Sequence, residues 1–221
     1  MIGEIEFYKI PKSDYQTTFK PGQFFYAPIP FFYPSSIKTL TLDYFNPSNP
    51  DNCNFRIQEI SPNEIKSKGV KPIPEINVKP GEILIMNKHK IRPVISISNC
   101  HPYLLDSTKS NGNCIFCVPL YSTKDKADNY KFSEEFIKKI QAYQYPTLFL
   151  LPEDKAKYAN ESIVRFSRAG FIPQSYLNPI PLELTEIALE CITKWFHFLT
   201  LGELDETISI YKQLLEPKLL G

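Results

Sequence analysis

The sequence has little glycine, almost no net charge and no long apolar run. Only 8 of its 221 residues are glycine, against 20 prolines, and 25 basic residues nearly balance 24 acidic ones. Such a chain has no global field for a polyanion, so any nucleic-acid contact has to be local. No stretch reaches the roughly 18 apolar residues of a membrane span, and residues 1–6 lack the regions of a signal peptide. We therefore expect a soluble, cytoplasmic protein without a membrane partner.

The cysteines are few and odd in number. Five cysteines in a chain of this length do not suggest a disulfide framework, so reduced and mostly buried thiols are expected. Cys100, His101, Cys114 and Cys117 have the residue types of a zinc site. However, Cys114 and Cys117 lie three apart within an expected strand and would point to opposite faces of it. We therefore expect core cysteines, with no metal site and no cofactor.

Prolines punctuate the first 80 residues and separate short segments rich in β-branched or aromatic residues. These segments, at 23–27, 37–44 and 55–60, are bounded by turn-forming residues and predict strands. Residues 1–76 are therefore expected to form a β-rich extension. Its aromatic run between Phe24 and Tyr33 could stack bases, but the interleaved prolines and the lack of nearby lysine or arginine favour an apolar seam.

The rest of the chain, residues 77–221, predicts a second set of elements. Strands are expected at 82–86, 93–98, 114–120, 147–151 and 161–168, and a helix with Ser133 as its N-cap at 133–144. Apolar residues at three- and four-residue steps predict a helix over 182–201 that stops at Gly202, and a second helix follows at 203–215. This order indicates an α+β fold, mainly β with C-terminal helices, of which an SH3-like barrel is one form.

Three segments in this region resemble core strands of the MazF/PemK family, the toxins of toxin–antitoxin pairs. They are Pro80-Gly81-Glu82, the run from Arg92 to Ser98, and the run from Cys114 to Pro119. A weaker similarity continues through 145–147, 161–166 and 182–201. The resemblance implies an SH3-like barrel at 77–221, here with a helical insertion at about 124–144. It also implies a homodimer, an antitoxin partner, and metal-independent endoribonuclease activity on single-stranded mRNA.

The same resemblance implies the roles of particular residues. Arg92 would be catalytic, as proton donor or acceptor and as the cation that stabilises the phosphorane-like transition state. The ribose 2′-hydroxyl would be the nucleophile and would leave a cyclic phosphate. The family's second catalytic position, a threonine or serine, falls by spacing on Tyr121. Ser122, favoured over Thr123, could supply the hydroxyl if the strand ended in a one-residue bulge, and the phenol of Tyr121 itself could donate a hydrogen bond to phosphate.

Further contacts with RNA are expected around Arg92. The short connection before it contains Lys88, His89 and Lys90, which would form a cationic corner for a phosphate. Arg168 lies near a family position that contacts RNA, and Arg165 is expected on the other face of the same strand. Each of these residues has a simpler interpretation as a surface side chain, and Arg92 itself could pair with a carboxylate or extend to solvent. Residues 124–144 could act as a lid or block the groove.

Two other functions fit the sequence. A non-catalytic member of the same fold could bind RNA, DNA or protein, as the shortened connection and the altered hydroxyl position suggest. A structural protein could use its aromatic extension for interactions. An enzyme needs Arg92 and a hydroxyl within reach of one phosphate, whereas a binding module needs only the basic corner.

Overall fold

The computed structural model describes residues 6–30, 37–44, 54–60, 85–86, 89–99, 113–154 and 159–202. The chain divides into two compact units, residues 1–28 with 91–221 and residues 29–90. The boundary expected near residue 76 stays a prediction. The strand at 23–30, which belongs to the expected extension, lies inside the main sheet.

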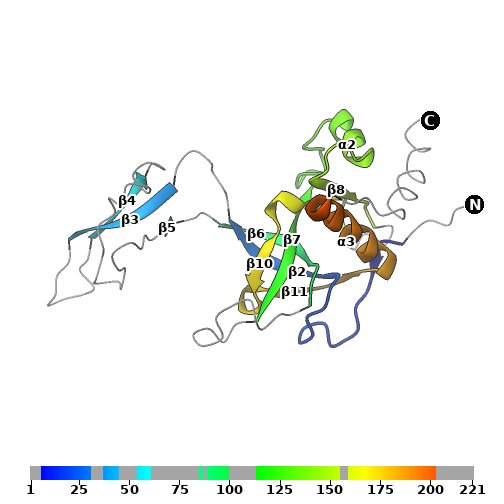
Figure 1. Ribbon diagram of the computed structural model, residues 1–221, viewed down its shortest axis with the longest axis horizontal. Helices are drawn as coiled ribbons and strands as arrows, with labels where there is room; N and C mark the ends of the chain where they lie inside the picture. The colour runs from blue at the N-terminus through cyan, green and yellow to red at the C-terminus, as the bar shows by residue number, and fades with distance from the viewer. Residues whose placement is uncertain are drawn as a thin grey trace, which may run out of the picture. The chain divides into compact units, whose positions relative to one another are not determined.

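The main sheet is built mostly of antiparallel strands (Figure 1). Its strands are β1 (Tyr8–Lys9), β2 (Gln23–Pro30), β6 (His89–Ser96), β7 (Cys114–Ser122), β8 (Leu148–Leu151), β9 (Ser162–Arg165), β10 (Gly170–Pro173) and β11 (Asn178–Leu184). They follow the order β1-β11-β2-β6-β7-β9-β8, with β10 also paired to β7. The mainly β, α+β class is thus confirmed. Since β1 and β8 end the path, the described strands form an open sheet, and a closed barrel is not confirmed.

Most predicted strands are present, but the prediction was wrong around residue 182. Residues 182–184 are the end of β11 rather than the start of a helix, and Leu184 is paired with Tyr8 of β1. The helix α3 (Glu186–Leu201) begins after Thr185, whose hydroxyl accepts a hydrogen bond from the Ala188 N–H. Leu184 happens to continue the helical spacing of apolar residues, which is why the pattern extended the helix too far. The helix expected at 203–215 lies outside the described residues.

Two further boundaries differ from the prediction. The helix expected at 133–144 is α2 (Glu134–Gln141), with Ser133 as its N-cap. The strand expected at 161–168 ends at Arg165, and the short 3-10 helix η3 (Phe166–Arg168) follows it. A second 3-10 helix, η4 (Gln174–Tyr176), connects β10 to β11.

One face of the sheet forms the main core with α3. Val118 and Leu120 of β7 pack there with Val164 of β9, and Ile192 and Trp195 of α3 join them. The Trp195 Nε1–H donates to the Pro146 carbonyl oxygen at 2.7 Å. The helix ends at Gly202, whose φ of 76° is the left-handed conformation that favours glycine. The prediction of a helix stop at this residue is confirmed.

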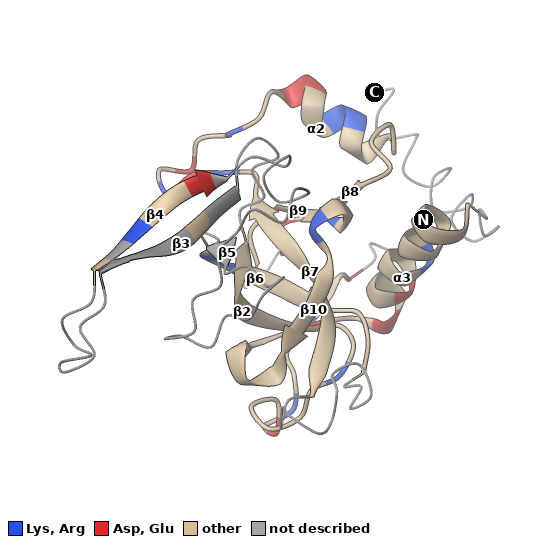
Figure 2. Ribbon diagram, turned by 60° about the vertical axis from the view of Figure 1, so that its left-hand side comes forward, with Lys and Arg blue, Asp and Glu red and all other residues tan. Residues whose placement is uncertain are grey.

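The opposite face of β7, β9 and β8 is covered by α2. Side chains alternate along a strand, so Tyr121 and Ile163 face away from the α3 core. Ile137 and Ile140 of α2 form a separate cluster with Ile163, against which Tyr121 packs. Figure 2 shows α2 and α3 as two separate helices beside this sheet.

The chain enters β2 through a tight turn. Gly22 has a φ of 85°, donates its N–H to the Ser96 carbonyl oxygen and accepts from the Leu184 N–H, both at 2.8 Å. Beside it, the buried Glu183 carboxylate pairs with the Lys20 ammonium at 2.8 Å. These contacts tie the N-terminal segment to the main sheet.

The smaller unit contains a three-stranded sheet in the order β4-β3-β5. Its strands are β3 (Ile37–Tyr44), β4 (Asn54–Ile60) and β5 (Ile85–Met86). β3 and β4 form an antiparallel pair from Ile37↔Ile60 to Tyr44↔Asn54, with one irregularity near Leu42. The strands predicted at 37–44 and 55–60 are therefore confirmed. Within the part of the chain that the structure describes, no helix has the length and apolarity of a membrane span.

Candidate functional site

Two arginines lie over the ring of one tyrosine. The guanidinium carbon of Arg92 is 4.2 Å from the centroid of the Tyr121 ring. The guanidinium carbon of Arg165 is 5.5 Å from the same centroid. Both distances are within the range of a cation–π interaction. We call these three residues the Arg–Tyr–Arg cluster.

Three adjacent strands bring these residues together. In the β6–β7 pair Val94 is opposite Pro119, and continuing this register by two residues on each strand places Arg92 opposite Tyr121. In the β7–β9 pair Tyr121 is opposite Ile163. Arg165 is two residues further along β9 and shares the face of Ile163. Each of the three strands thus presents one residue of the cluster on the same face.

The cluster concentrates positive charge on a nearly neutral protein. All three residues are half-buried, and two of them are arginines, which carry the positive charge of the cluster. The face of the phenol is negative and attracts both cations. A guanidinium group can bind a phosphate or carboxylate through two parallel hydrogen bonds. The arrangement is therefore suited to an anion with several oxygens.

The two other predicted hydroxyls lie elsewhere. The β7–β9 register runs from Leu120↔Val164 to Ser122↔Ser162 without a shift, so Ser122 points to the opposite face from Tyr121. Its hydroxyl donates to the Lys124 carbonyl oxygen at 2.8 Å and accepts from the Lys124 N–H at 3.2 Å. Thr123 is fully buried, and its hydroxyl donates to the Glu161 carbonyl oxygen at 3.1 Å. The bulge that would bring Ser122 beside Arg92 is not formed in this pair of strands.

The other predicted RNA contacts stay predictions. His89 and Lys90 are exposed at the start of β6 and belong to the smaller unit, and Lys88 lies outside the described residues. Arg168 is half-buried in η3, so the strand alternation used to place it does not apply. Sequence reasoning gave Arg165 no role of its own. Its place becomes clear only from the pairing of Tyr121 with Ile163.

An ordered loop follows β7 and leads toward α2. The Asp125 carboxylate accepts hydrogen bonds from the N–H groups of Asn129 and Ala127, at 3.0 and 2.8 Å. These hydrogen bonds lower the pKa of Asp125. The Lys124 ammonium pairs with Asp128 at 3.1 Å and lies 5.3 Å from the centre of the Tyr130 ring. The loop next to the cluster therefore has a defined conformation.

The cysteines that the structure describes are core residues, as expected. Cys114, Cys117 and Cys191 are buried and not in disulfides, and burial raises the pKa of the Cys117 thiol to about 12. Cys100 and His101 lie outside the described residues. Elsewhere in the described part of the chain, no three histidine, cysteine, aspartate or glutamate side chains come close enough to hold a metal ion.

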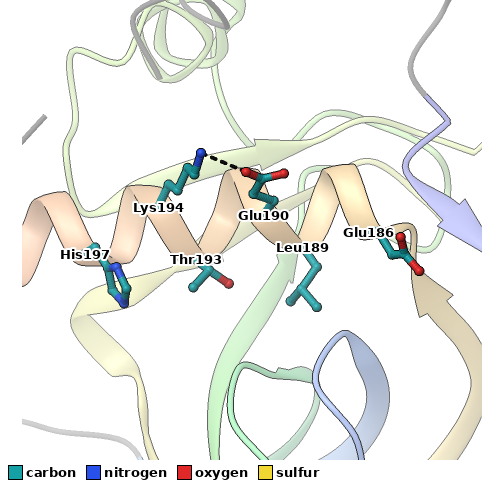
Figure 3. Close-up of a pocket in the computed structure, with 6 residues that line it drawn as sticks. All are labelled: Glu186, Leu189, Glu190, Thr193, Lys194 and His197. Atoms are coloured by element: carbon teal, nitrogen blue, oxygen red, sulfur yellow. Dashed lines mark ion pairs between the residues drawn. The ribbon is translucent and has the colours of Figure 1, made fainter. Parts of the chain in front are cut away.

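A hollow also runs along one side of α3, the helix that packs on the opposite face of the sheet from the cluster. Figure 3 shows its lining residues, which are Glu186, Leu189, Glu190, Thr193, Lys194 and His197. Lys194 pairs with Glu190 at 2.7 Å, one helical turn away. Such a pair is typical of a solvated helix surface, and it offers no concentration of one charge comparable to the Arg–Tyr–Arg cluster.

Comparison with known proteins identifies no relative of this chain. It gives no significant match to protein-family models, to curated proteins or to solved structures.

Proposed function

We propose that the protein is a MazF/PemK-like endoribonuclease that binds single-stranded RNA at the Arg–Tyr–Arg cluster and cleaves it without a metal ion. The observation that supports this is the contact between Arg92 and Tyr121 at 4.2 Å. These are the two positions to which the family resemblance assigns catalysis. Arg165 adds a second cation to the same ring.

Cleavage of the phosphodiester requires stabilisation of the developing negative charge and transfer of two protons. The ribose 2′-oxygen forms a bond to phosphorus while the bond from phosphorus to the 5′-oxygen breaks. One proton passes from the 2′-hydroxyl to water, and one is delivered to the 5′-oxygen by water or by the Tyr121 phenol. Arg92 and Arg165 would hold the non-bridging oxygens as charge develops on them. The phenol of Tyr121 is the hydroxyl available beside them as a proton or hydrogen-bond donor.

The partners proposed with this function are single-stranded RNA, an antitoxin protein and a second copy of the chain. Single-stranded DNA would bind without cleavage, because it lacks the 2′-hydroxyl nucleophile. Comparing RNA and DNA oligonucleotides of the same sequence therefore distinguishes binding, which both should show, from cleavage, which only RNA should show.

The test is cleavage of a long single-stranded RNA in the presence of a chelator, with the product ends mapped. Removal of one preorganised donor to a developing negative charge costs about 100- to 1,000-fold in rate, so we expect such a loss in Arg92→Ala and a similar one in Arg165→Ala. Tyr121→Phe should slow cleavage while keeping RNA binding. Ser122→Ala is the matched control, since its hydroxyl faces away from the cluster. Cyclic-phosphate ends support the mechanism, and cleavage that survives Arg92→Ala contradicts it.

A second function, a non-catalytic nucleic-acid-binding module, is favoured by the state of the hydroxyls. The Ser122 hydroxyl is engaged in its own turn and Thr123 is buried, whereas the family resemblance calls for an aliphatic hydroxyl at the site. This function predicts RNA binding that depends on Arg92, with no cleavage by the wild-type protein.

A further inference from the structure

We propose that α2 is a lid on the Arg–Tyr–Arg cluster, docked on the face that a nucleic acid would occupy, and that α2 undocks when RNA binds there. The inference rests on the proposed function of the cluster. Its support comes from the packing of α2, from the contacts that hold it and from the backbone on either side of it.

The packing places α2 on the same apolar cluster against which Tyr121 packs. Ile137 and Ile140 are 8% and 1% exposed, and both pack against Ile163. Ile163 is the residue opposite Tyr121 in the β7–β9 pair, and Tyr121 itself packs against this cluster. A nucleotide that stacks on or beside the Tyr121 ring therefore meets the docked helix.

The contacts that hold α2 in place are apolar. Its ion pairs join residues of the helix to one another, Glu134 to Lys138 at 2.9 Å and Glu135 to Lys139 at 2.6 Å. The Ser133 hydroxyl caps the same helix by accepting from the Phe136 N–H at 3.3 Å. The polar interactions that stabilise the helix would therefore survive undocking. Docking depends on the isoleucine cluster and on the aromatic contacts around it.

The backbone on either side of α2 contains two residues in the left-handed region. Asp128, before the helix, has a φ of 64°, and Tyr143, after it, has a φ of 56°. Non-glycine residues rarely adopt this conformation, and such residues gather in segments that switch. Tyr143 is also anchored, because its ring lies 4.7 Å from that of Trp195 in the main core. Because the Lys131 N–H donates to the Thr123 carbonyl oxygen at 2.8 Å, the part of the segment that can move without disturbing the sheet lies between Lys131 and Tyr143.

The first test is hydrogen exchange of the wild-type protein, with and without a single-stranded RNA oligonucleotide. We expect the amides of α2 to exchange faster when RNA is bound, while those of β7 become slower to exchange. Slower exchange of α2 in the complex would overturn the proposal, because it would mean that RNA binds with the helix docked.

The second test releases the lid by substitution. Ile137→Gln removes a docking side chain and keeps a residue that favours helix. Its matched control is Ile187→Gln, the same change on α3, where the isoleucine is 48% exposed. If the competent, undocked state is about one tenth of the population, release should tighten RNA binding about tenfold. Unchanged or weaker binding by a folded Ile137→Gln protein would contradict the proposal.

The third test locks the lid with an Ile137→Cys/Ile163→Cys pair, which keeps the experiment decisive if Ile137→Gln does not fold. The disulfide form should lose RNA binding and recover it on reduction, and each single cysteine variant should bind in both conditions. Wild-type affinity in the oxidised double variant refutes the lid but leaves the cluster as the binding site. RNA binding that does not depend on Arg92 refutes the proposed function instead, so the two failures are distinguishable.

Discussion

The proposed binding site makes a quantitative prediction about salt. For single-stranded nucleic acid, each phosphate neutralised by the protein contributes about −0.7 to the slope of log K against log salt concentration. If Arg92 and Arg165 each hold one phosphate, replacing either with alanine should make the slope shallower by about 0.7, and replacing both by about 1.4. The two arginines together should therefore account for about 1.4 of the slope of log K against log salt concentration.

The loss of affinity at one salt concentration follows from the exposure of the two side chains. A hydrogen bond to a charged group contributes about 1.5–3 kcal/mol, but both arginines are half-buried and solvent screens such pairs. We therefore expect about 1–2 kcal/mol for each arginine, which is about 5- to 30-fold in Kd. The two losses should not simply add, since both guanidinium groups share the Tyr121 ring.

The assay is fluorescence anisotropy of a labelled RNA oligonucleotide over a series of salt concentrations. Arg92→Lys separates charge from geometry: the slope should stay unchanged, while the lost stacking on Tyr121 weakens binding by about 0.5–1 kcal/mol. Lys194→Ala, on the opposite side of the sheet, controls for the loss of any one cation. A slope that is the same in wild type and in Arg92→Ala would refute the reasoning. A change in Arg168→Ala but not in Arg165→Ala would place the RNA on η3 instead.

The remaining predictions concern stability and the reactivity of one thiol. Trp195→Phe should lower the free energy of unfolding in urea by about 1–3 kcal/mol, because the Pro146 carbonyl oxygen loses its donor; an unchanged midpoint would contradict this. Cys117 should resist thiol reagents in the native protein at pH 8. The raised pKa of its thiol should also make stability fall as pH rises from its ordinary value of 9.0 toward about 12, since the unfolded state loses its proton first. Thermal melts with and without Cys117→Ala test that loss. Gly22→Ala should cost about 1 kcal/mol because of its φ of 85°; Gly170→Ala, where an added Cβ meets nothing within 4 Å, should melt like wild type.

The elements that could be predicted from the sequence are those whose local pattern agrees with their place in the fold. β7 has a continuous apolar run and becomes a central strand, and α2 has an N-cap and charges of suitable sign at both ends. Two strands, β10 and β11, were not predicted because their sequences are unfavourable for a strand. β11 contains Pro179 and Pro181, which usually exclude a strand interior, and β10 is four residues long between Gly170 and Pro173. Their pairing partners lie far away in the sequence, so only tertiary contacts reveal them.

The candidate site also contains residues that the sequence could place and residues that it could not. The placement of Arg92 near the end of β7 required only that two neighbouring strands pair, and the sequence indicated both strands. The choice among the hydroxyls of Tyr121, Ser122 and Thr123 depended on one residue of register, which a sequence alone does not determine. Arg165 depended on a third strand, and its distance of 5.5 Å from the Tyr121 ring reflects the pairing of Tyr121 with Ile163.

The low net charge of the chain makes the proposed lid more important for RNA binding. A chain with a net charge of +1 has no long-range attraction for RNA, so its affinity depends on a few contacts. Two phosphate contacts give a total slope of only about −1.4. Any steeper slope in the wild-type protein requires other cations, and Lys88, Lys90 and Arg168 are the predicted RNA contacts that could supply them. With so few contacts, the cost of undocking α2 is a large fraction of the binding free energy. On this proposal, the apolar contacts of the isoleucine cluster would be sufficient to control the access of RNA to the site.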